Sequence, residues 1–321
     1  MRRLFRAREL GILLVLAVEI AVFSILTHRP DRPNPMLDAA NLLATVRDMT
    51  VLATAALGSC VIIISGGIDL SVGSCIALTS VVTAQAIVSG HSPVSACLLG
   101  ISTAVAMGLL SATFITRAKL PPFIATLGMM SIARGLAYLV TKGATIPIPD
   151  SGFTRGLGSG MVPLLGVSVP VPVLLLVVCA LVFHLFLTRT RFGREIYALG
   201  GNEEAARLSG VPIVRLKYLV YALGGLMAGL AGVIFTAYYG TGQSTAAMGW
   251  ELDAIASVVI GGGSLSGGRG SVWGTCIGAL IFQVLRSGLA MVGASDYNQL
   301  IIGAVVIAVV AFDQVTRKGR G

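Results

Sequence analysis

Residues 61–74, with the sequence VIIISGGIDLSVGS, interrupt an apolar segment with a glycine pair and a single acid. A short apolar run ends at Gly66 and Gly67, and a new helix is predicted to open around Cys75. Residues 258–271, with the sequence VVIGGGSLSGGRGS, follow the same order and precede a similar helix opening at Cys276. The two stretches predict a weak internal repeat of two units that have the same orientation in a membrane.

Paired glycine-interrupted segments in two halves of a membrane protein are typical of a transport pathway, because freed backbone groups need protein or water around them. The alternative is two helix–turn–helix corners of ordinary composition. Asp69 also leaves two interpretations open: an ionisable residue in a membrane is a functional candidate, but near the cytoplasmic end of a span it can cap a helix with Ser71. The candidate pathway residues are Gly66, Gly67, Asp69, Ser71, Gly261, Gly262 and Gly263.

The composition indicates an integral membrane protein. Of the 321 residues, 55% are hydrophobic and 12% are charged, and the mean hydropathy is +0.89. A soluble domain carries about 25% charged residues, so much of this surface is expected to face lipid. The net charge of +9 does not predict nucleic-acid binding, because Lys and Arg lie in the gaps between apolar runs, as in cytoplasmic loops.

The chain offers little for catalysis. It contains no GxxxxGK[ST] phosphate loop, no HExxH and no GxSxG, and its three histidines have no metal-ligand spacing. The five cysteines lie in or beside apolar runs without a CxxC pair, so we expect neither a disulfide nor a metal site. We predict that the chain is not an enzyme and binds no cofactor of its own.

The apolar runs predict an all-α membrane protein with about ten transmembrane helices, with eight as the lower figure. They fall at residues 10–26, 51–65, 73–88, 93–116, 123–141, 172–187, 218–239, 252–260, 272–292 and 300–312. No small-x-small cleavage site follows the first run, so we expect an uncleaved span rather than a signal peptide. Basic residues at both ends and in two loops predict cytoplasmic N- and C-termini, which require an even number of spans.

The loop at residues 189–217 predicts a short helix on the cytoplasmic side. Asn202 is a good N-cap, and Glu203 and Glu204 suit the first turn. Gly210 can end the helix, and Pro212 follows it. The helix formers between them are Ala205, Ala206, Arg207 and Leu208. A connection needs no such helix, so we interpret it as a surface that docks into a partner protein; the alternative is a helix lying on lipid headgroups.

Four stretches, in this order, resemble landmarks of the ribose-type permeases of bacterial ABC importers, in the branched-chain amino acid/ribose permease superfamily. GGIDLSVG at 66–73 resembles the family signature, and LPPFIATLG at 120–128 resembles the next landmark. GGNEEAARLSG at 200–210 resembles the ATPase-coupling loop, and IGGGSLSGGRGS at 260–271 resembles the glycine-rich C-terminal segment. The similarity covers most of the chain, from Asn41 to Asp313, in the order and spacing of the family.

This resemblance implies a type II ABC importer-like permease, with one transmembrane domain over residues 1–321 and a coupling loop at 189–217. The implied partners are a second permease subunit, identical or closely related, a cytoplasmic ABC ATPase that holds the ATP and Mg, and a periplasmic or lipid-anchored solute-binding protein. The implied solute is a monosaccharide such as ribose, or a related polar solute, moved across the cytoplasmic (inner) membrane by alternating access. The alternative is an ion-gradient-driven secondary transporter, which would need a functional acid or histidine deep in the membrane.

Other polar residues of the predicted spans carry weaker expectations. Arg134 and His184 are expected to reach an interface or a polar contact between helices. Glu251 and Asp253 open a short run near the outer face, where capping explains them and a pathway mouth is the alternative. The aromatic residues expected to anchor the chain at the outer interface are Tyr238, Tyr239 and Trp250.

Overall fold

The structure is a computed structural model that describes residues 2–28, 33–164 and 166–318. The described part is mostly helical, as predicted, and it adds four short strands that were not predicted. The elements are α1 (Arg2–Leu26), α2 (Ala39–Ile64), α3 (Val72–Val88), α4 (Pro93–Thr116), α5 (Pro122–Thr141), β1 (Ile146–Pro147), η1 (Thr154–Gly158), β2 (Met161–Leu164), β3 (Val167–Pro170), α6 (Val171–Arg189), α7 (Arg191–Gly201), α8 (Glu203–Leu208), α9 (Ile213–Tyr239), β4 (Thr241–Gly242), α10 (Trp250–Ile260), α11 (Val272–Met291), η2 (Ser295–Tyr297) and α12 (Asn298–Lys318).

Polar caps define the starts of several long helices. Asp38 accepts hydrogen bonds from two backbone N–H groups in the first turn of α2. Ser92 caps α4, in which Pro93 takes the first position, where its missing N–H costs nothing. Ser271 caps α11 by accepting the N–H of Gly274 at 3.3 Å. These short polar side chains satisfy N–H groups that have no partner within their own helix.

The predicted number of about ten spans is not confirmed. Among the described residues, six helices are long and apolar enough to cross a membrane, namely α2, α4, α5, α6, α9 and α11. The run at 252–260 forms part of α10, which has only 11 residues. At this length α10 extends about 16 Å, roughly half the hydrocarbon thickness of about 30 Å, so it cannot cross the membrane alone.

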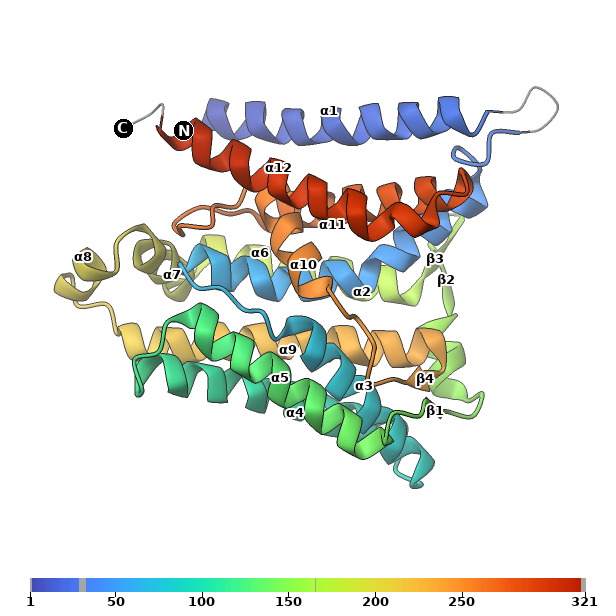
Figure 1. The fold of residues 1–321 in the computed structure, drawn as a ribbon, viewed down its shortest axis with the longest axis horizontal. Coiled ribbons are helices and arrows are strands. Elements are labelled where there is room, and N and C mark those ends of the chain that lie inside the picture. Colours follow the sequence, from blue (N-terminus) through green and yellow to red (C-terminus); the bar gives the residue numbers. More distant parts are fainter. Residues whose placement is uncertain (1, 29–32, 165, 319–321) are drawn as a thin grey trace.

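Helices α2 and α9 form the centre of the bundle. In the most apolar window of each helix, 89% of α2 and 72% of α9 is buried. Figure 1 shows α1 and α12 on one flank of this centre and α4 and α5 on the other. Glycines bring α4 and α9 close together: a Cβ atom on Gly229 would lie 2.9 Å from the Cα of Ile101. Such contacts through small residues are typical of helix packing in membranes.

Two helices begin inside the bundle rather than at its ends. After α2, residues 65–71 run back without helical structure before α3 begins, and residues 240–249 run inward before α10 begins (Figure 1). The two helix starts touch, since a Cβ atom on Gly73 would lie 2.6 Å from Oε2 of Glu251. The predicted repeat is not confirmed: the break at Gly66 leads into an interior helix start, whereas Gly261 follows the end of α10.

The two ends of the bundle are built differently. Helices α7 and α8 lie at one end, termed the α8 end, where α1 also begins and α12 ends (Figure 1). The opposite end, termed the hairpin end, carries η1 and two antiparallel two-stranded sheets, β1 with β4 and β2 with β3. Ile146 pairs with Gly242 and Pro147 with Thr241, so the loop after α5 is joined to the loop after α9.

Candidate functional site

The helix predicted in the loop at residues 189–217 is confirmed as α8, which follows directly after α7. Asn202 accepts the backbone N–H of Ala205 at 2.9 Å and thereby caps the helix. Gly210 has a φ of +82°, and its N–H donates to the carbonyl of Arg207 at 3.0 Å. The N–H of Val211 donates to the carbonyl of Ala206 at 3.1 Å. The helix therefore has a defined start and a glycine-dependent end.

Charged side chains attach α8 to α9, and one apolar side chain of α8 is exposed at the surface. Glu203 accepts a hydrogen bond from Nζ of Lys217 on α9 at 2.7 Å. Glu204 accepts two hydrogen bonds from Arg207, which lower the pKa of Glu204 and raise the pKa of Arg207, so both are charged at neutral pH. Leu208 is 74% exposed. Leu208 is therefore a large apolar side chain of α8 that the described part of the chain leaves uncovered.

Helix α7 connects α8 to both glycine-rich segments. A Cβ atom on Gly200 would lie 2.6 Å from the backbone nitrogen of Gly268 and closer still to the carbonyl oxygen of Ile64. That oxygen accepts the N–H of Gly268 at 2.8 Å. The hydroxyl of Tyr197 donates to the carbonyl of Gly270 at 2.9 Å, and burial raises the pKa of Tyr197 to about 12, which keeps the donor proton at neutral pH. We term these contacts among α7, the end of α2 and residues 268–270 the glycine junction.

A cavity of about 420 Å³ lies beside α8. Its walls come from the turn between α4 and α5, with Lys119 and Leu120, and from the α8 and α9 side, with Glu203 and Lys217. Lys119 has a φ of 55°, in the left-handed region that few residues other than glycine occupy. The stretch at 120–128 that resembles a family landmark therefore begins at the wall of a depression next to the predicted coupling helix.

Asp69 is buried in the non-helical segment between α2 and α3. Its Oδ1 accepts the backbone N–H of Ser71 at 2.7 Å and the hydroxyl of Ser71 at 2.6 Å. The neighbouring carbonyl of Ile68 accepts the hydroxyls of Thr126 at 3.3 Å and Tyr221 at 3.4 Å. Asp69 therefore holds the turn that leads into α3, but the predicted side-chain cap is not formed, because Ser71 precedes the helix and makes no side-chain cap hydrogen bond. A contact of Asp69 with a solute stays a prediction.

A second polar group lies where α3 and α10 begin. Nη1 of Arg134, on α5, donates to the carbonyl oxygens of Ser244 and Ala246, each at 2.7 Å. Glu251 stands in the first turn of α10, and its buried Oε2 has no hydrogen-bond partner among the described residues. Arg134 and Glu251 also interact electrostatically. The predicted polar contact of Arg134 thus joins α5 to the irregular segment before α10.

Charged side chains also accompany the aromatic residues that were predicted as interface anchors. Arg286 on α11 forms an ion pair with the buried Asp253 of α10, and its guanidinium carbon lies 5.3 Å from the ring centre of Trp250. Arg47 on α2 lies 4.2 Å from the ring centre of Tyr238. The sequence alone does not indicate these arginines, because their partners come from other helices. Tyr238 and Trp250 thus gain cation–π contacts, and their role as anchors at a membrane interface stays a prediction.

The glycines of the second predicted pathway segment have a local packing role. A Cβ atom on Gly261 would lie 2.6 Å from the backbone nitrogen of Thr275, so α10 ends tightly against the start of α11. Gly262 has a φ of +95°, and the N–H of Gly263 donates to the carbonyl of Val258 at 2.7 Å. The two glycine-rich segments meet directly in the glycine junction, where the N–H of Gly268 donates to the carbonyl of Ile64 and a Cβ atom on Gly267 would lie 2.9 Å from the Cα of Gly66.

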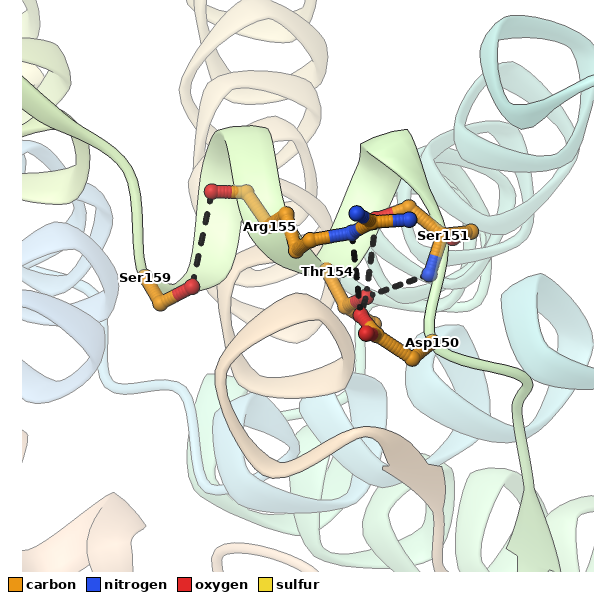
Figure 2. Close-up of polar contacts among 5 residues, drawn as sticks. All are labelled: Asp150, Ser151, Thr154, Arg155 and Ser159. Carbon is orange, nitrogen blue, oxygen red and sulfur yellow. Dashed lines mark hydrogen bonds and ion pairs between the residues drawn. The ribbon is translucent and has the colours of Figure 1, made fainter.

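The loop after α5 presents polar side chains at the hairpin end. Figure 2 shows Arg155 paired with Asp150, at 3.4 Å, and Thr154 between Asp150 and Ser151. The Thr154 hydroxyl donates to Asp150 at 3.1 Å and accepts the N–H of Ser151 at 2.9 Å. The side chains of Arg155 and Asp150 are 70% and 74% exposed, so this loop offers both charges to the surroundings.

Known proteins are similar to this chain along most of its length. The model of the permease component of branched-chain amino acid transport systems matches residues 41–310. The chain belongs to this family. The matched range begins in α2 and ends in α12, so it includes α8, both interior helix starts and the glycine junction. Family membership and the six long apolar helices together make the chain a multi-pass membrane protein, as predicted.

Curated relatives carry the names of transport permeases. The ribose import permease protein RbsC of Bacillus subtilis (strain 168) is 41% identical over 306 residues, which cover 94% of this chain and 91% of the relative. The D-allose transport system permease protein AlsC of Escherichia coli (strain K12) is 35% identical over 313 residues, which cover 96% of this chain and 92% of the relative. The probable ABC transporter permease protein YphD of the same strain is 34% identical over 301 residues, which cover 94% of this chain and 87% of the relative.

Proposed function

We propose that this chain is the permease subunit of an ATP-driven ABC importer that carries a monosaccharide across the inner membrane. The observation that supports this most is the 41% identity to a ribose import permease over 94% of the chain. The similarity to a D-allose permease makes allose the second candidate solute. The chain itself performs no ATP hydrolysis in this proposal, because ATP and Mg bind to a separate ATPase subunit.

The proposed docking surface for the ATPase is α8. Its capped start at Asn202 and the Glu203–Lys217 contact give it a fixed orientation relative to α9. The exposed Leu208 supplies apolar surface that a docked partner would remove from water. The glycine junction then connects a displacement of α8 to α2 and α10, the two helices that precede the glycine-rich segments.

The proposed orientation places the α8 end in the cytoplasm. Lys and Arg are enriched in cytoplasmic loops, and many described basic residues lie at this end. Because α1 begins and α12 ends there (Figure 1), both termini would be cytoplasmic. The hairpin end, with its exposed Asp150 and Arg155, would then face the solute-binding protein. The basic residues at the α8 end are Arg117, Lys119, Arg189, Arg191, Arg194, Arg207, Arg215, Lys217 and Arg269.

The proposed mechanism is alternating access between two permease subunits, either two copies of this chain or this chain and a close relative. ATP binding closes the ATPase, the ATPase displaces α8, and the glycine junction passes the displacement to α2 and α10. The interior starts of α3 and α10 allow such movement without unfolding a complete span, because non-helical segments already connect them to the neighbouring helices.

Uptake measurements in the native host test this proposal. Deletion of the gene should abolish ATP-dependent uptake of labelled ribose or allose, and the intact gene should restore it. Glu203→Lys places a positive charge next to Lys217, so it should lower uptake while an immunoblot shows the same amount of chain in the membrane. Unchanged sugar uptake in the deletion strain would contradict the sugar assignment. Uptake that depends on an ion gradient and not on ATP would favour a secondary transporter.

A further inference from the structure

The segment between α9 and α10, residues 240–249 and here termed the strap, crosses the middle of the membrane region. α10 has 11 residues and ends at the α8 end, so its start at Trp250 lies about 16 Å inside that end. Figure 1 shows the strap running from the hairpin end inward to this point. Its outer part, β4, is short, and the remainder forms no regular structure except turns.

The strap has a specific conformation that the neighbouring helices hold. Arg134 of α5 donates to two of its carbonyl oxygens, those of Ser244 and Ala246, at 2.7 Å each. Ala247 has a φ of 51° and Gly249 a φ of +84°, so two nearby residues take left-handed conformations. A non-glycine residue keeps such a conformation only where its surroundings require it. Arg134 therefore acts as a positioning residue for the strap.

The strap is also exposed on one side of the chain. Thr245 is exposed, Met248 is 62% exposed, and Leu252 in the first turn of α10 is 52% exposed. Irregular backbone at membrane depth is tolerated only against protein or water, because lipid offers no hydrogen bonds to it. An arginine and a glutamate beside it add to the cost of lipid contact. This face therefore does not face hydrocarbon.

We propose that the strap lines the water-filled solute pathway at mid-membrane, with Thr245 and Met248 facing the passing sugar. The identity of the solute rests on the proposed function, whereas the presence of water at the strap does not. Hydroxyl and thioether side chains offer weak contacts, which suit a path that a sugar must also leave. The remaining donors of Arg134 lie beside this path and can bind sugar hydroxyls in passing.

Thiol labelling tests the proposal. Met248→Cys and Thr245→Cys are compared with Val182→Cys on α6, a control that is 56% exposed, close to the 62% of Met248. The assembled transporter in membrane vesicles is treated with a charged, membrane-impermeant methanethiosulfonate, and the wild-type chain gives the background of its five native cysteines. Because only the thiolate reacts, and hydrocarbon suppresses ionisation, the strap thiols should react at least about tenfold faster than the control.

Equal labelling rates at Met248→Cys and Val182→Cys would overturn the proposal. Strap thiols that stay unreactive because a partner chain buries them away from water would also overturn it. Ribose or allose in excess should slow labelling at the strap. Fast labelling at a rate that neither sugar changes would support the presence of water at the strap and would contradict only the assignment of the sugar. Arg134→Leu removes both carbonyl contacts and should change the labelling rate of Thr245→Cys, whereas Arg134→Lys, which keeps a donor, should restore it in part. An identical rate in Arg134→Leu would refute the positioning role.

Discussion

The glycine junction makes a quantitative prediction for Gly200→Ala. The new Cβ atom would lie 2.6 Å from the nitrogen of Gly268, whereas ordinary contacts of a Cβ atom are 3.4–4 Å, so the backbones must separate. Separation weakens the 2.8 Å hydrogen bond from Gly268 to Ile64. Overpacking costs about 1–3 kcal/mol and a lost hydrogen bond about 1 kcal/mol, which gives a destabilisation of about 2–4 kcal/mol.

Gly201→Ala is a matched control, because it changes the next residue of the same helix. A Cβ atom on Gly201 meets nothing within 4 Å. Both variants gain the same small advantage of alanine over glycine in a helix, so the difference between them isolates the packing cost. The free energy of unfolding is measured by a denaturing titration in mixed detergent micelles, in which tryptophan fluorescence reports the folded fraction. Equal unfolding free energies for the two variants would refute the packing argument.

The same pair of variants tests coupling. If the junction transmits the movement of α8, Gly200→Ala should lower the amount of sugar imported per ATP hydrolysed, because the altered contact no longer moves α2 and α10 together with α7. Gly201→Ala should leave this ratio unchanged. A normal ratio in a destabilised Gly200→Ala would show that the junction contributes to stability only.

Three further predictions concern single contacts. Leu208→Glu should abolish co-purification of the ATPase without a change in unfolding, since the side chain is 74% exposed; retained co-purification would exclude it as the anchor. Arg286→Leu should lower the free energy of unfolding by about 3–5 kcal/mol, because it leaves the buried Asp253 unpaired. The double variant Arg286→Leu with Asp253→Asn should recover most of this free energy, and a double variant that is equally unstable would contradict the prediction. Tyr197→Phe should cost about 0.5–1.5 kcal/mol, measured by the same unfolding titration, because it removes the hydrogen bond to Gly270; an unchanged unfolding free energy would mean that this bond adds nothing.

Local signals in the sequence were sufficient for α8. Asn202, Glu203 and Gly210 act within one or two helical turns, so their pattern predicts the capped helix without knowledge of the fold. The apolar runs likewise predict the long helices α4, α5, α6, α9 and α11 within a few residues. These features depend on neighbours in the chain, which the sequence displays directly.

The interior helix starts could not be predicted in the same way. Residues 73–88 and 252–260 are as apolar as complete spans, and nothing in their composition places their first residues at mid-membrane. That depth follows from contacts between distant segments, such as Gly73 against Glu251 and Arg134 against Ser244. The ion pair of Asp253 with Arg286 was missed for the same reason.

Two further elements had weak local signals. The hairpin of β2 and β3 lies in a loop whose only alternation of apolar and polar residues, Val167-Ser168-Val169, is too short to predict a strand. Gly166, beside the turn, has a φ of +84°. The helix α2 starts at Ala39, twelve residues before the apolar run predicted at 51–65, because Asp38 caps it and polar residues occupy its first turns. Arg47 therefore lies outside the predicted run although it belongs to α2 and packs on Tyr238.

Co-purification of the tagged chain from its native membrane in mild detergent tests the central claim most directly. We predict that an ATPase with a phosphate-binding loop co-purifies, and that the complex imports labelled ribose or allose with ATP once it is reconstituted in liposomes with its binding protein. A chain that purifies without an ATPase and still moves solute alone would contradict the account and establish a secondary transporter.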